Sequence, residues 1–579
     1  MKYQDTKVRS PRRRNPEPFR RESAIKYPLW GLLALLVFLM PASASAAIYY
    51  LNPVSGNDSN PGTAASPWRT FRHAAQTLQA GNTAIFADGT YVETQRVVVT
   101  HSGTASAPIV FRSQNKHGAV IMFQGVQTAW GHLYTRQSYI TVQDFEITQD
   151  AKGTTASDVL VYFDNTTAVL ADPASTGNRF IGNKVHNAYF NTLKVYKSDN
   201  FIADGNELYD SNGIAFVATN AHNPIFRNNY IYDVSAAVAQ SGAALQFKGG
   251  DRSAQVYNNV FRVKTGRTVV TALVIGGGSS ANAVYDSSVN GYECFNCVAY
   301  NNVIVAEDIG SMEYGLLMSG CKDCALLNNI VIGAVWGVYL TKGNGDQAAG
   351  WAWDPKTKDP VVKNNMILNS HGTGSHTSFF LGGVGNIEGT VTHDYNLFFN
   401  AAGNNTLPPS EPNGVYTNPL LVNTLTDWHL QSGSPAITAG EAQVFIGFLG
   451  ETIDVSKDKD SIQRSPVGSW DIGVYEVSAE PPTPVIPDTT PPTVTITSPA
   501  QGATVSGRVT INVLGNDNMG VTGLTQYVYV DNRLKCIGNG AELSCPWNTR
   551  KVARGLHTIE AVAKDAAGNS ATITIQVTK

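Results

Sequence analysis

Residues that could move a proton or bind a carboxylate gather in two short segments of the chain, 192–199 and 244–252. With two neighbours from the intervening stretch, the basic, acidic, aromatic and amide residues are Lys194, Tyr196, Asp210, Asn212, Gln246, Lys248, Asp251 and Arg252. An amine can serve as a base, and cationic or amide groups can hold an anion. The two segments lie far apart in sequence, so they form one site only if the fold brings them together.

A recurring phrase between residues 180 and 400 predicts how that happens. The phrase has variants such as NFIADGNELYD, PIFRNNYIYD and CALLNNIVIG. Aligned on one asparagine, its eight copies contain Asn183, Asn206, Asn229, Asn259, Asn302, Asn329, Asn365 and Asn396. A short repeated unit with a remainder of variable length is typical of a solenoid, in which each coil buries its apolar side only by stacking on its neighbours.

Each phrase reads as two short strands that meet at a bend. Apolar and polar residues alternate around every asparagine, and β-branched and aromatic residues are frequent, which indicates β-strand. Asparagine tolerates the left-handed conformation of a tight bend. Stacked coils would place these amides about 4.8 Å apart, close enough for hydrogen bonds along the stack. We place Asp144 at the same position in SYITVQDFEITQD. The alternative is a set of unrelated asparagine turns between hairpins.

A third strand aligns in most coils. We expect Lys194 and Tyr196 to point outward, as do Gln246 and Lys248, while the alternate apolar residues face a filled core. In the coil between them, at 213–220, we expect Ile214 and Phe216 to point inward and Ala215 and Val217 outward. Three strands per coil around a filled core make an all-β fold, the parallel β-helix.

At this point the chain resembles the right-handed parallel β-helix proteins of the pectate-lyase-like superfamily. The resemblance covers about 48–476. It rests on the asparagine ladder, on an opening stretch with the segment SPWRTFRHAAQTLQ, which is similar to the family's N-terminal cap with its short helix, and on a closing SGSPAITAG and SPVGSWDIGVYE, which resemble its last coil. The helix would place Phe71, Ala74, Ala75 and Leu78 on one face. This fold supports lyases, hydrolases, epimerases and adhesins, so the resemblance predicts fold better than function.

The composition divides the chain into four parts. Residues 1–46 have a basic start, a short apolar run and a small-residue A-x-A site, which predicts a signal peptide; the alternative is an uncleaved anchor. Residues 47–476 form the β-helix with its cap, 477–491 a proline-rich linker, and 492–579 a small β-sandwich that resembles bacterial immunoglobulin-like domains. Removing the first part, which has a net charge of +6, takes the net charge from −3 to −9. We therefore expect a secreted or cell-surface monomer with no nucleic-acid partner and no membrane association after cleavage.

The superfamily resemblance implies chemical roles for the clustered residues. In its lyases the polysaccharide lies along the outer face of one sheet, calcium or a basic residue neutralises a uronate carboxylate, and lysine or arginine often takes the α-proton. Transferred to this sequence, Lys248 is the candidate base, Arg252 or Lys194 faces the carboxylate, and Asp210 or Asp251 would bind calcium. The candidate substrate-binding residues are Tyr196, Gln246, Tyr339, Trp351 and Trp353. For each residue, a place in a solvated polar patch is the alternative, and the two tryptophans could instead plug apolar outer residues.

Six cysteines add a redox question. Cys536 and Cys545 flank a predicted hairpin and are expected to form a disulfide. CFNC and CKDC, which contain Cys294, Cys297, Cys321 and Cys324, precede two successive ladder phrases in the same register. Stacked coils would lay one pair over the other, as disulfides, as buried structural thiols or, less in keeping with an exported protein, as a zinc site.

Three functions remain open on these grounds. The first is a secreted polysaccharide lyase that cleaves a uronate-containing glycan by β-elimination. The second is a non-catalytic extracellular protein that binds glycan or mediates adhesion. The third is a glycoside hydrolase, which needs two carboxylates facing one groove about 5–10 Å apart; the sequence shows no paired-aspartate signature for it.

Overall fold

The chain was analysed as a computed structural model of residues 1–579. The structure describes residues 46–126, 131–150, 159–165, 175–234, 243–279, 291–343, 355–370, 379–381, 385–401, 410–466, 468–477, 488, 490–518, 520–521 and 523–579. The predicted signal peptide up to residue 45, most of the proline-rich linker, and Trp351 and Trp353 lie outside these ranges. Within them, no helix has the length and apolar character needed to cross a membrane.

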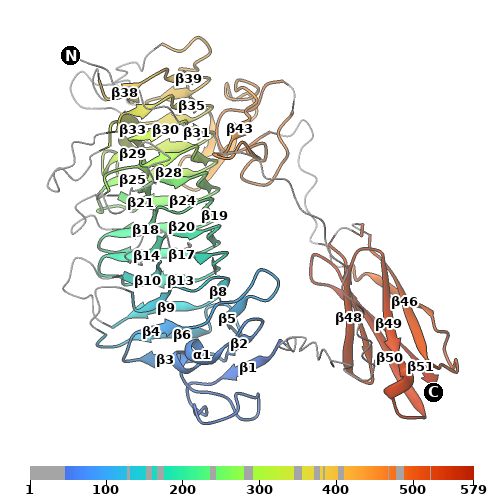
Figure 1. The fold of residues 1–579 in the computed structure, drawn as a ribbon. Helices are drawn as coiled ribbons and strands as arrows, with labels where there is room; N and C mark the ends of the chain where they lie inside the picture. The colour runs from blue at the N-terminus through green and yellow to red at the C-terminus, as the bar shows by residue number, and fades with distance from the viewer. Residues whose placement is uncertain are drawn as a thin grey trace, which may run out of the picture.

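The solenoid is built from three long parallel sheets, each taking one strand from successive coils (Figure 1). Every pairing within these three sheets is parallel, and each strand pairs with its counterpart one coil away. The backbone N–H and C=O groups on both sides of an inner strand form hydrogen bonds with the strands of the coils before and after it. The predicted parallel β-helix with three strands per coil is confirmed.

The strands of each sheet run in chain order along the stack. Sheet 1 has twelve described strands: β1 (Ile48–Leu51), β2 (Thr83–Phe86), β5 (Ile109–Ser113), β8 (Ile140–Gln143), β12 (Arg179–Ile181), β16 (Ile202–Asp204), β19 (Ile225–Arg227), β23 (Gln255–Tyr257), β27 (Val298–Tyr300), β31 (Ala325–Leu327), β35 (Val361–Lys363) and β39 (Thr392–Asp394). Sheet 2 has eleven: β3 (Gly89–Glu93), β6 (Ala119–Phe123), β9 (Glu146–Gln149), β13 (Lys184–His186), β17 (Glu207–Ser211), β20 (Tyr230–Val234), β24 (Val260–Val263), β28 (Val303–Ala306), β32 (Ile330–Ile332), β36 (Met366–Leu368) and β40 (Leu397–Phe399).

Sheet 3 carries the segments with candidate functional residues. Its ten described strands are β4 (Val97–Val99), β7 (Leu133–Thr135), β10 (Val159–Phe163), β14 (Asn191–Tyr196), β18 (Ile214–Thr219), β21 (Ala243–Lys248), β25 (Val269–Gly276), β29 (Met312–Ser319), β33 (Ala334–Thr341) and β37 (Phe379–Leu381). Two-residue strands form smaller sheets at the corner between sheets 3 and 1: β11 (Ser175–Thr176) with β15 (Ser198–Asp199), and β22 (Asp251–Arg252), β26 (Cys294–Phe295), β30 (Cys321–Lys322), β34 (Thr357–Lys358) and β38 (Ile387–Glu388).

The eight asparagines form one continuous hydrogen-bonded column between sheets 1 and 2. Each side-chain Nδ2 donates to the Oδ1 of the next asparagine, from Asn183 to Asn206 at 3.3 Å through to Asn365 and Asn396 at 3.0 Å. The column ends on Glu411, whose Oε1 accepts from Asn396 at 2.9 Å. All eight amides are buried, so these bonds satisfy groups that water cannot reach. The predicted ladder is confirmed.

The left-handed residue of each bend precedes the ladder asparagine. Gly205, Asn228 and Asn258 have φ of 65°, 55° and 57°. We expected the ladder asparagine itself to take the left-handed conformation, and this expectation is wrong. The placement of Asp144 in the ladder of the earlier coil is wrong for the same reason. Asp144, with φ of 62°, is the bend residue there. Phe145 takes the ladder position and donates its backbone N–H to Asn183 Oδ1 at 3.0 Å.

A short helix closes the N-terminal end of the stack. Helix α1 (Phe71–Thr77) begins after Thr70, whose side chain accepts from the backbone N–H of His73, a standard N-cap. Phe71, Ala74, Ala75 and Leu78 are all at most 1% exposed and join the solenoid core, as predicted from their spacing. The helix covers apolar surface that the first coil would otherwise leave open.

Beyond Val415, which forms a parallel bridge with Leu397, the chain up to residue 477 packs along the side of the solenoid instead of forming a last coil. Its short hairpins are β41 (Leu421–Asn423) with β42 (Asp427–Leu430) and β43 (Phe445–Ile446) with β44 (Thr452–Ile453). Trp428, Ile472 and Val474 bury the outer faces of β28, β32 and β36, and Trp470 buries those of β27 and β31. Figure 1 shows this segment beside the stack, next to the label β43. The expected final coil is therefore wrong; SGSPAITAG and the WDIGVYE stretch are a lateral cover.

The C-terminal domain is a two-layer antiparallel β-sandwich, as predicted. One layer contains β45 (Thr493–Ser498), β46 (Arg508–Asn516) and β49 (Glu542–Asn548); the other contains β48 (Arg533–Asn539), β47 (Thr525–Val530), β50 (Leu556–Lys564) and β51 (Ser570–Thr578). A single 3₁₀ turn, η3 (Thr549–Lys551), follows β49. Cys536 and Cys545 form the predicted disulfide, with 5.7 Å between their Cα atoms. Because β48 and β49 belong to different layers, the bridge joins the two sheets.

The four solenoid cysteines are buried free thiols. Cys294 and Cys321 occupy paired positions on β26 and β30, so the predicted stacking is confirmed. The predicted disulfides are absent: Cys294 donates to the carbonyl of Phe247 at 2.9 Å, and Cys324 Sγ accepts from the backbone N–H of Cys297 at 3.3 Å. The described residues contain no set of three of these thiols close enough to share a metal ion. The thiols pack as small core residues.

We predict that Asn259→Ala destabilises the solenoid by roughly 2–4 kcal/mol, because it orphans several buried partners at about 1–3 kcal/mol each. Asn259 Oδ1 accepts from the N–H and the Nδ2 of Asn229, and its own Nδ2 donates to Phe226 and Asn302. The check is the urea midpoint followed by circular dichroism. Asn115→Ala, which removes one exposed bond to Asp88, is the control and should cost less than about 0.5 kcal/mol. Equal shifts for the two variants would contradict a structural role for the ladder.

Candidate functional site

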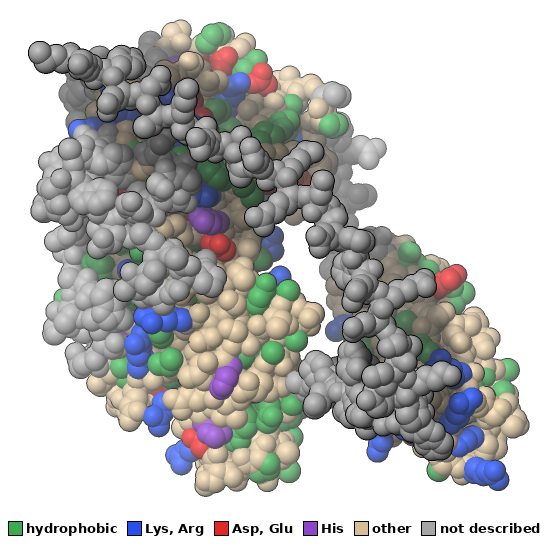
Figure 2. Space-filling model, viewed as in Figure 1, with side chains coloured by type: hydrophobic (Ala, Val, Ile, Leu, Met, Phe, Trp, Pro, Cys, Tyr) green, Lys and Arg blue, Asp and Glu red, His purple; other side chains and the backbone are tan. Residues whose placement is uncertain are grey.

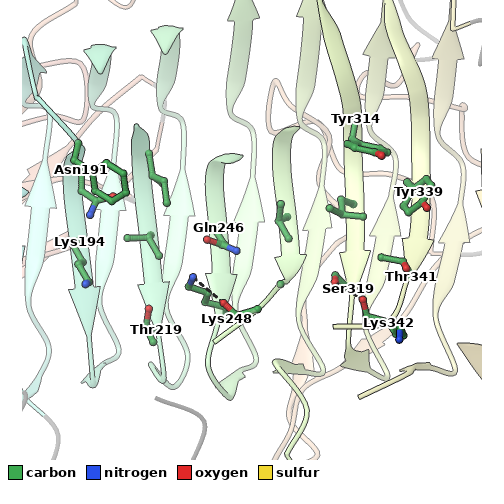
Figure 3. A pocket seen from close by; sticks show the side chains of 17 residues that line it. Asn191, Lys194, Thr219, Gln246, Lys248, Tyr314, Ser319, Tyr339, Thr341 and Lys342 are labelled. Atoms are coloured by element: carbon green, nitrogen blue, oxygen red, sulfur yellow. Dashed lines mark hydrogen bonds between the residues drawn. The ribbon is translucent and has the colours of Figure 1, made fainter. Parts of the chain in front are cut away.

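A groove with a cavity volume of about 800 Å³ lies on the outer face of sheet 3, across β14, β18, β21, β25, β29 and β33 (Figure 3). The carboxyl ends of the strands contribute mostly polar residues to its lining, and the middle of the strands contributes both polar and apolar ones. The lining residues are Phe190, Asn191, Lys194, Ile214, Val217, Thr219, Gln246, Lys248, Val274, Gly277, Gly278, Tyr314, Leu317, Ser319, Tyr339, Thr341 and Lys342.

Parallel register brings four of the sequence-predicted residues into this groove. Lys194, Gln246, Lys248 and Tyr339 all line it. Lys194 pairs with Val217, which pairs with Gln246, so the lysine and the glutamine stand two strands apart on one row. That row continues through Val274 and Leu317 to Tyr339. Residues distant in sequence become neighbours because each coil repeats the same strand at the same height.

Strand β18, between the strands that contain the two lysines, pairs with its neighbours in a different register from the one we expected. Leu193 pairs with Phe216, and Phe216 with Leu245, so residues 213–220 sit two positions away from the alignment made on sequence. Ala215 lies in the core, whereas Ile214 lines the groove. The predicted inward Ile214 and outward Ala215 are therefore wrong. Thr219 instead takes the outward place beside Lys248.

Other predicted residues lie outside the groove lining. Tyr196 packs beside the groove against the aromatic cluster of Tyr134 and Tyr162. Arg252 is on corner strand β22, with its guanidinium carbon 4.5 Å from the ring centroid of Phe448 in the lateral cover. The turn after β21 redirects the chain, so Arg252 does not share the outward direction of Lys248. The roles of Trp351 and Trp353 remain predictions, since both lie outside the described residues.

The carboxylates proposed for calcium do not fit an ion in this groove. Asp251 is wholly buried, its Oδ1 accepts from the backbone N–H of Ala221 at 2.7 Å, and burial raises its pKa well above the ordinary range. Burial that disfavours the charged form of a carboxyl also makes it a poor ligand for a hard cation, and Asp251 does not line the groove. Asp210 occupies a left-handed bend at the end of β17 and does not line the groove. Within the described ranges, the one group of three carboxylates that lie close enough to share an ion is Asp488, Asp517 and Asp565, in the C-terminal domain.

Lys194 and Lys248 are two of the three lysines that line the described groove; the third, Lys342, follows β33. Burial lowers the pKa of Lys248, an effect that nearby Glu293 and Asp251 partly offset. Burial also lowers the pKa of Lys194, and the charge of Lys248 lowers it further. A lysine with a depressed pKa carries a larger neutral fraction near physiological pH and is a better base than an exposed one. The same pair, when protonated, forms a strong anion-binding site.

Lys248 is held in place by a glycine turn that no sequence pattern marked. Its Nζ donates to the carbonyl of Gly278 at 3.2 Å, shown as the dashed line in Figure 3. Beneath, the buried carboxylate of Glu293 accepts from the backbone N–H of Gly249 at 2.8 Å and from the Ser279 hydroxyl at 2.7 Å. Glu293 thus ties the end of β21 to the glycine turn that follows β25. Glu293 lies in a long insertion outside the aligned phrases, so no periodic signal marked it.

The aromatic end of the groove was predicted only in part. Tyr339 was expected, but its neighbour Tyr314 was not: their ring centroids are 4.8 Å apart at 62°. β29 begins at Met312, three residues before the aligned segment, so Tyr314 fell outside the alignment. Asn191 was missed for the same reason, since β14 begins one residue before the segment at 192–199.

No Asp or Glu is found among the described residues that line the groove. A glycoside hydrolase needs two carboxylates across its scissile bond. The described part of the groove therefore does not provide hydrolase chemistry, whereas it does provide amines.

Comparisons with known proteins bear on the two domains separately. A family model described as "Bacterial Ig domain" matches residues 492–561. The C-terminal domain is a bacterial immunoglobulin-like domain. This match, together with the two antiparallel layers, confirms the interpretation made from the sequence.

Curated relatives match only short stretches. The uncharacterized protein YwoF of Bacillus subtilis (strain 168) is 41% identical over 80 residues, which is 14% of this chain and 16% of the relative. Pectate lyase PEL9 of Emericella nidulans is 37% identical over 83 residues, 14% of this chain and 20% of the relative. The matches thus span at most a fifth of these relatives.

Solved structures show a general similarity. XylC in complex with xylose has a TM-score of 0.46 and 12% identity, and the alignment covers 74% of this chain and 98% of that one. The lyase Pedsa3628 of family PL6 from Pseudopedobacter saltans has a TM-score of 0.40 and 13% identity, with coverages of 70% and 97%. Our assignment of the β-helix rests on strand register and the ladder.

We predict that Lys248→Met raises the pKa of Lys194, because it removes the like charge that lowers this pKa. The measurement is an NMR titration of protein labelled with ¹³C-lysine, with Lys194 assigned by its own substitution. Lys116→Met, at an exposed lysine outside the groove lining, should leave the Lys194 titration unchanged. A Lys194 pKa that stays constant or falls in the Lys248 variant would show that the two amines do not interact.

Proposed function

We propose that the protein is a polysaccharide lyase that cleaves a uronate-containing glycan by β-elimination in the groove of sheet 3, and that it acts outside the cell. The single observation that carries this proposal is the pair Lys194 and Lys248, two half-buried amines that line one open groove, with pKa values lowered by desolvation. Hydrolysis would need carboxylates there, and elimination from a uronate needs a base and a cation.

The basic character extends beyond the two lysines toward the N-terminal coils. Arg96 lies over the ring of Tyr134, with 3.6 Å between its guanidinium carbon and the ring centroid. Arg136 is paired with the carboxylate of Asp164 at 3.6 Å, so that pair adds little net charge. In Figure 2, Lys and Arg side chains gather at the left edge of the lower solenoid, where Figure 1 shows β4 and β10. A chain of uronates laid along sheet 3 would meet positive charge over several coils, which suits an anionic polymer.

Each lysine has a separate role in the proposed reaction. Protonated Lys194 faces the uronate carboxylate and stabilises the negative charge that develops when the neighbouring carbon loses its proton. Neutral Lys248 takes that proton on Nζ. The electron pair of the broken C–H bond forms the new C=C bond, the glycosidic C–O bond breaks, and the leaving oxygen is protonated from solvent. No step passes through a metal, because Asp210 and Asp251 do not fit one here.

The named relatives are compatible with this proposal. One of the two curated relatives is a pectate lyase by name, and a lyase is among the similar structures. The bacterial immunoglobulin-like domain equally suits a non-catalytic surface protein that binds glycan. Turnover is therefore the property that separates the two functions.

We expect wild-type protein to produce unsaturated uronate, measured by its absorbance near 230 nm, from at least one polymer in a panel of uronate glycans. Lys248→Ala should lower kcat by about 10²–10⁴-fold, as expected for loss of a general base. Lys116→Ala should change it less than twofold. Binding of a glycan without unsaturated product across the panel would overturn the lyase and support the surface-binding alternative.

We also expect activity to rise with pH through the pKa of Lys248, because only the neutral amine accepts a proton. Burial lowers that pKa below its ordinary value of 10.5, so the rise should come at lower pH than for an exposed lysine. The measurement is kcat/KM against pH. Lys248→Arg, whose side chain stays protonated, should lose the rise. A profile that falls as pH increases would exclude Lys248 as the base.

A further inference from the structure

The groove changes character along its length. Across one row of outward residues, the order is Lys194, Val217, Gln246, Val274, Leu317 and Tyr339. Along this row, amine and amide groups stand on β14 and β21, whereas the residues on β25, β29 and β33 are aliphatic or aromatic. Polar residues in the half of the groove over β25 to β33, Ser319, Thr341 and Lys342, lie off this row, at or just beyond the ends of β29 and β33. Figure 3 shows Lys194, Gln246 and Lys248 toward one side and Tyr314 and Tyr339 toward the other, with Ser319, Thr341 and Lys342 below the tyrosines.

The half of the groove over β14 to β21 contains two buried hydrogen-bond acceptors without donors. The Oε1 of Gln246 and the Oδ1 of Asn191 have no hydrogen-bond partner, and these residues are only 2% and 4% exposed. Both residues line the groove. A buried polar atom left unpaired costs about 1–3 kcal/mol, which a ligand that donates hydrogen bonds would recover. Hydroxyl groups of a sugar are such donors, and a carboxylate is not.

Backbone packing fixes the orientation of Gln246. Gly277 has φ of +134°, and a Cβ atom there would lie 2.3 Å from Gln246 Nε2. Glycine at this position lets the glutamine amide lie against the turn that also receives Lys248. Gln246 and Lys248 therefore present an acceptor and a cation from one strand, β21, as a sugar with a hydroxyl and a carboxylate requires.

The aromatic half offers a surface of different chemistry. Tyr314 and Tyr339 are half-buried, their centroids are 4.8 Å apart, and Leu317 lies on the same row as Tyr339. Behind them, Trp336 packs against Tyr339 with 6.0 Å between centroids. Aromatic and aliphatic side chains of this kind bind the apolar face of a sugar or a methyl substituent.

The two halves are too far apart for one sugar. Gln246 on β21 and Tyr339 on β33 are separated by three strand steps, or about 14 Å at the usual interstrand spacing. A glycan therefore needs at least two sugars in series to touch both.

We propose that the groove recognises a heteropolymer in which a uronate is linked to a less polar sugar, and not a uniform polyuronate. The uronate lies over Lys194, Gln246 and Lys248, and the neighbouring sugar places an apolar face or a deoxy or acetyl substituent on Leu317, Tyr314 and Tyr339. This inference deepens the proposed lyase function and rests on it for the identity of the anionic sugar.

The test measures binding apart from turnover. Calorimetry with the Lys248→Gln variant compares a tetrasaccharide of galacturonate alone with tetrasaccharides in which a uronate alternates with rhamnose or with N-acetylglucosamine. We expect at least one alternating ligand to bind at least tenfold more tightly than the uniform one. Equal or tighter binding of the uniform ligand would overturn the proposal.

Two further variants assign the preference to the aromatic half. In the same background, Tyr339→Ala should weaken the alternating ligand about tenfold and the uniform ligand less than twofold, while Tyr339→Phe keeps the preference and controls for packing. Gln246→Met should weaken both ligands alike. Equal loss of both ligands in Tyr339→Ala would place the aromatic residues outside specificity and overturn the proposal.

The assay also separates this inference from the lyase function. The enzyme could form unsaturated product from uniform and alternating polymers with equal kcat/KM, and Tyr339→Ala could leave both values unchanged. That result would overturn the proposed specificity but not the lyase function. Tighter binding of the alternating ligand, with no unsaturated product from any polymer, would overturn the lyase function. The proposed recognition of two kinds of sugar would then still hold.

Discussion

The whole solenoid depends on the column of asparagine amides. Each amide both donates and accepts along the stack, and each also bonds a backbone carbonyl in a preceding coil, as Asn206 does with Phe180 and Asn229 with Ala203. These bonds hold the bends of successive coils directly above one another despite coil lengths that vary from 23 to 43 residues. A parallel sheet has no turn to set its register, so something else must fix it. The column supplies that constraint at one corner, and the three sheets then follow.

The groove is a consequence of this alignment. Lys194 and Lys248 are neighbours because β14, β18 and β21 repeat one height on the stack. Variation in coil length is absorbed by insertions, which leaves the strands free to keep a common register while loops differ. Because each strand of sheet 3 contributes one residue to the outward row, the row can change from cationic to aromatic residues from strand to strand while the backbone stays the same.

Local patterns explain which parts of the fold were predictable. The ladder, the strand alternation and the cap helix are visible because they depend on neighbours within a few residues. The register of 213–220 was missed because it depends on an irregularity at the start of the strand, where Thr192 and Ala215 are buried beside core Leu193 and Phe216. Sequence alternation alone carries no information on such a shift.

The site was predictable only for residues inside the repeated strands. Lys194, Gln246, Lys248 and Tyr339 occupy regular outward positions, so periodicity placed them. Arg252 failed that rule because a turn redirects the chain after β21. Tyr314 was missed because β29 begins before the aligned segment. Glu293 was missed because it lies in the insertion of a long coil, where no repeat guides alignment.

The carboxylates beneath the groove influence the protonation of Lys248. A lone buried amine loses its proton and its positive charge, whereas one beside fixed carboxylates keeps a balance between the two states. Glu293 and Asp251 raise the pKa of Lys248 against the effect of burial. Glu293 also bonds Gly249 and Ser279 on either side of the lysine. One side chain thus sets both the position and the proton affinity of the amine, so its loss would disturb the groove even though no substrate touches it.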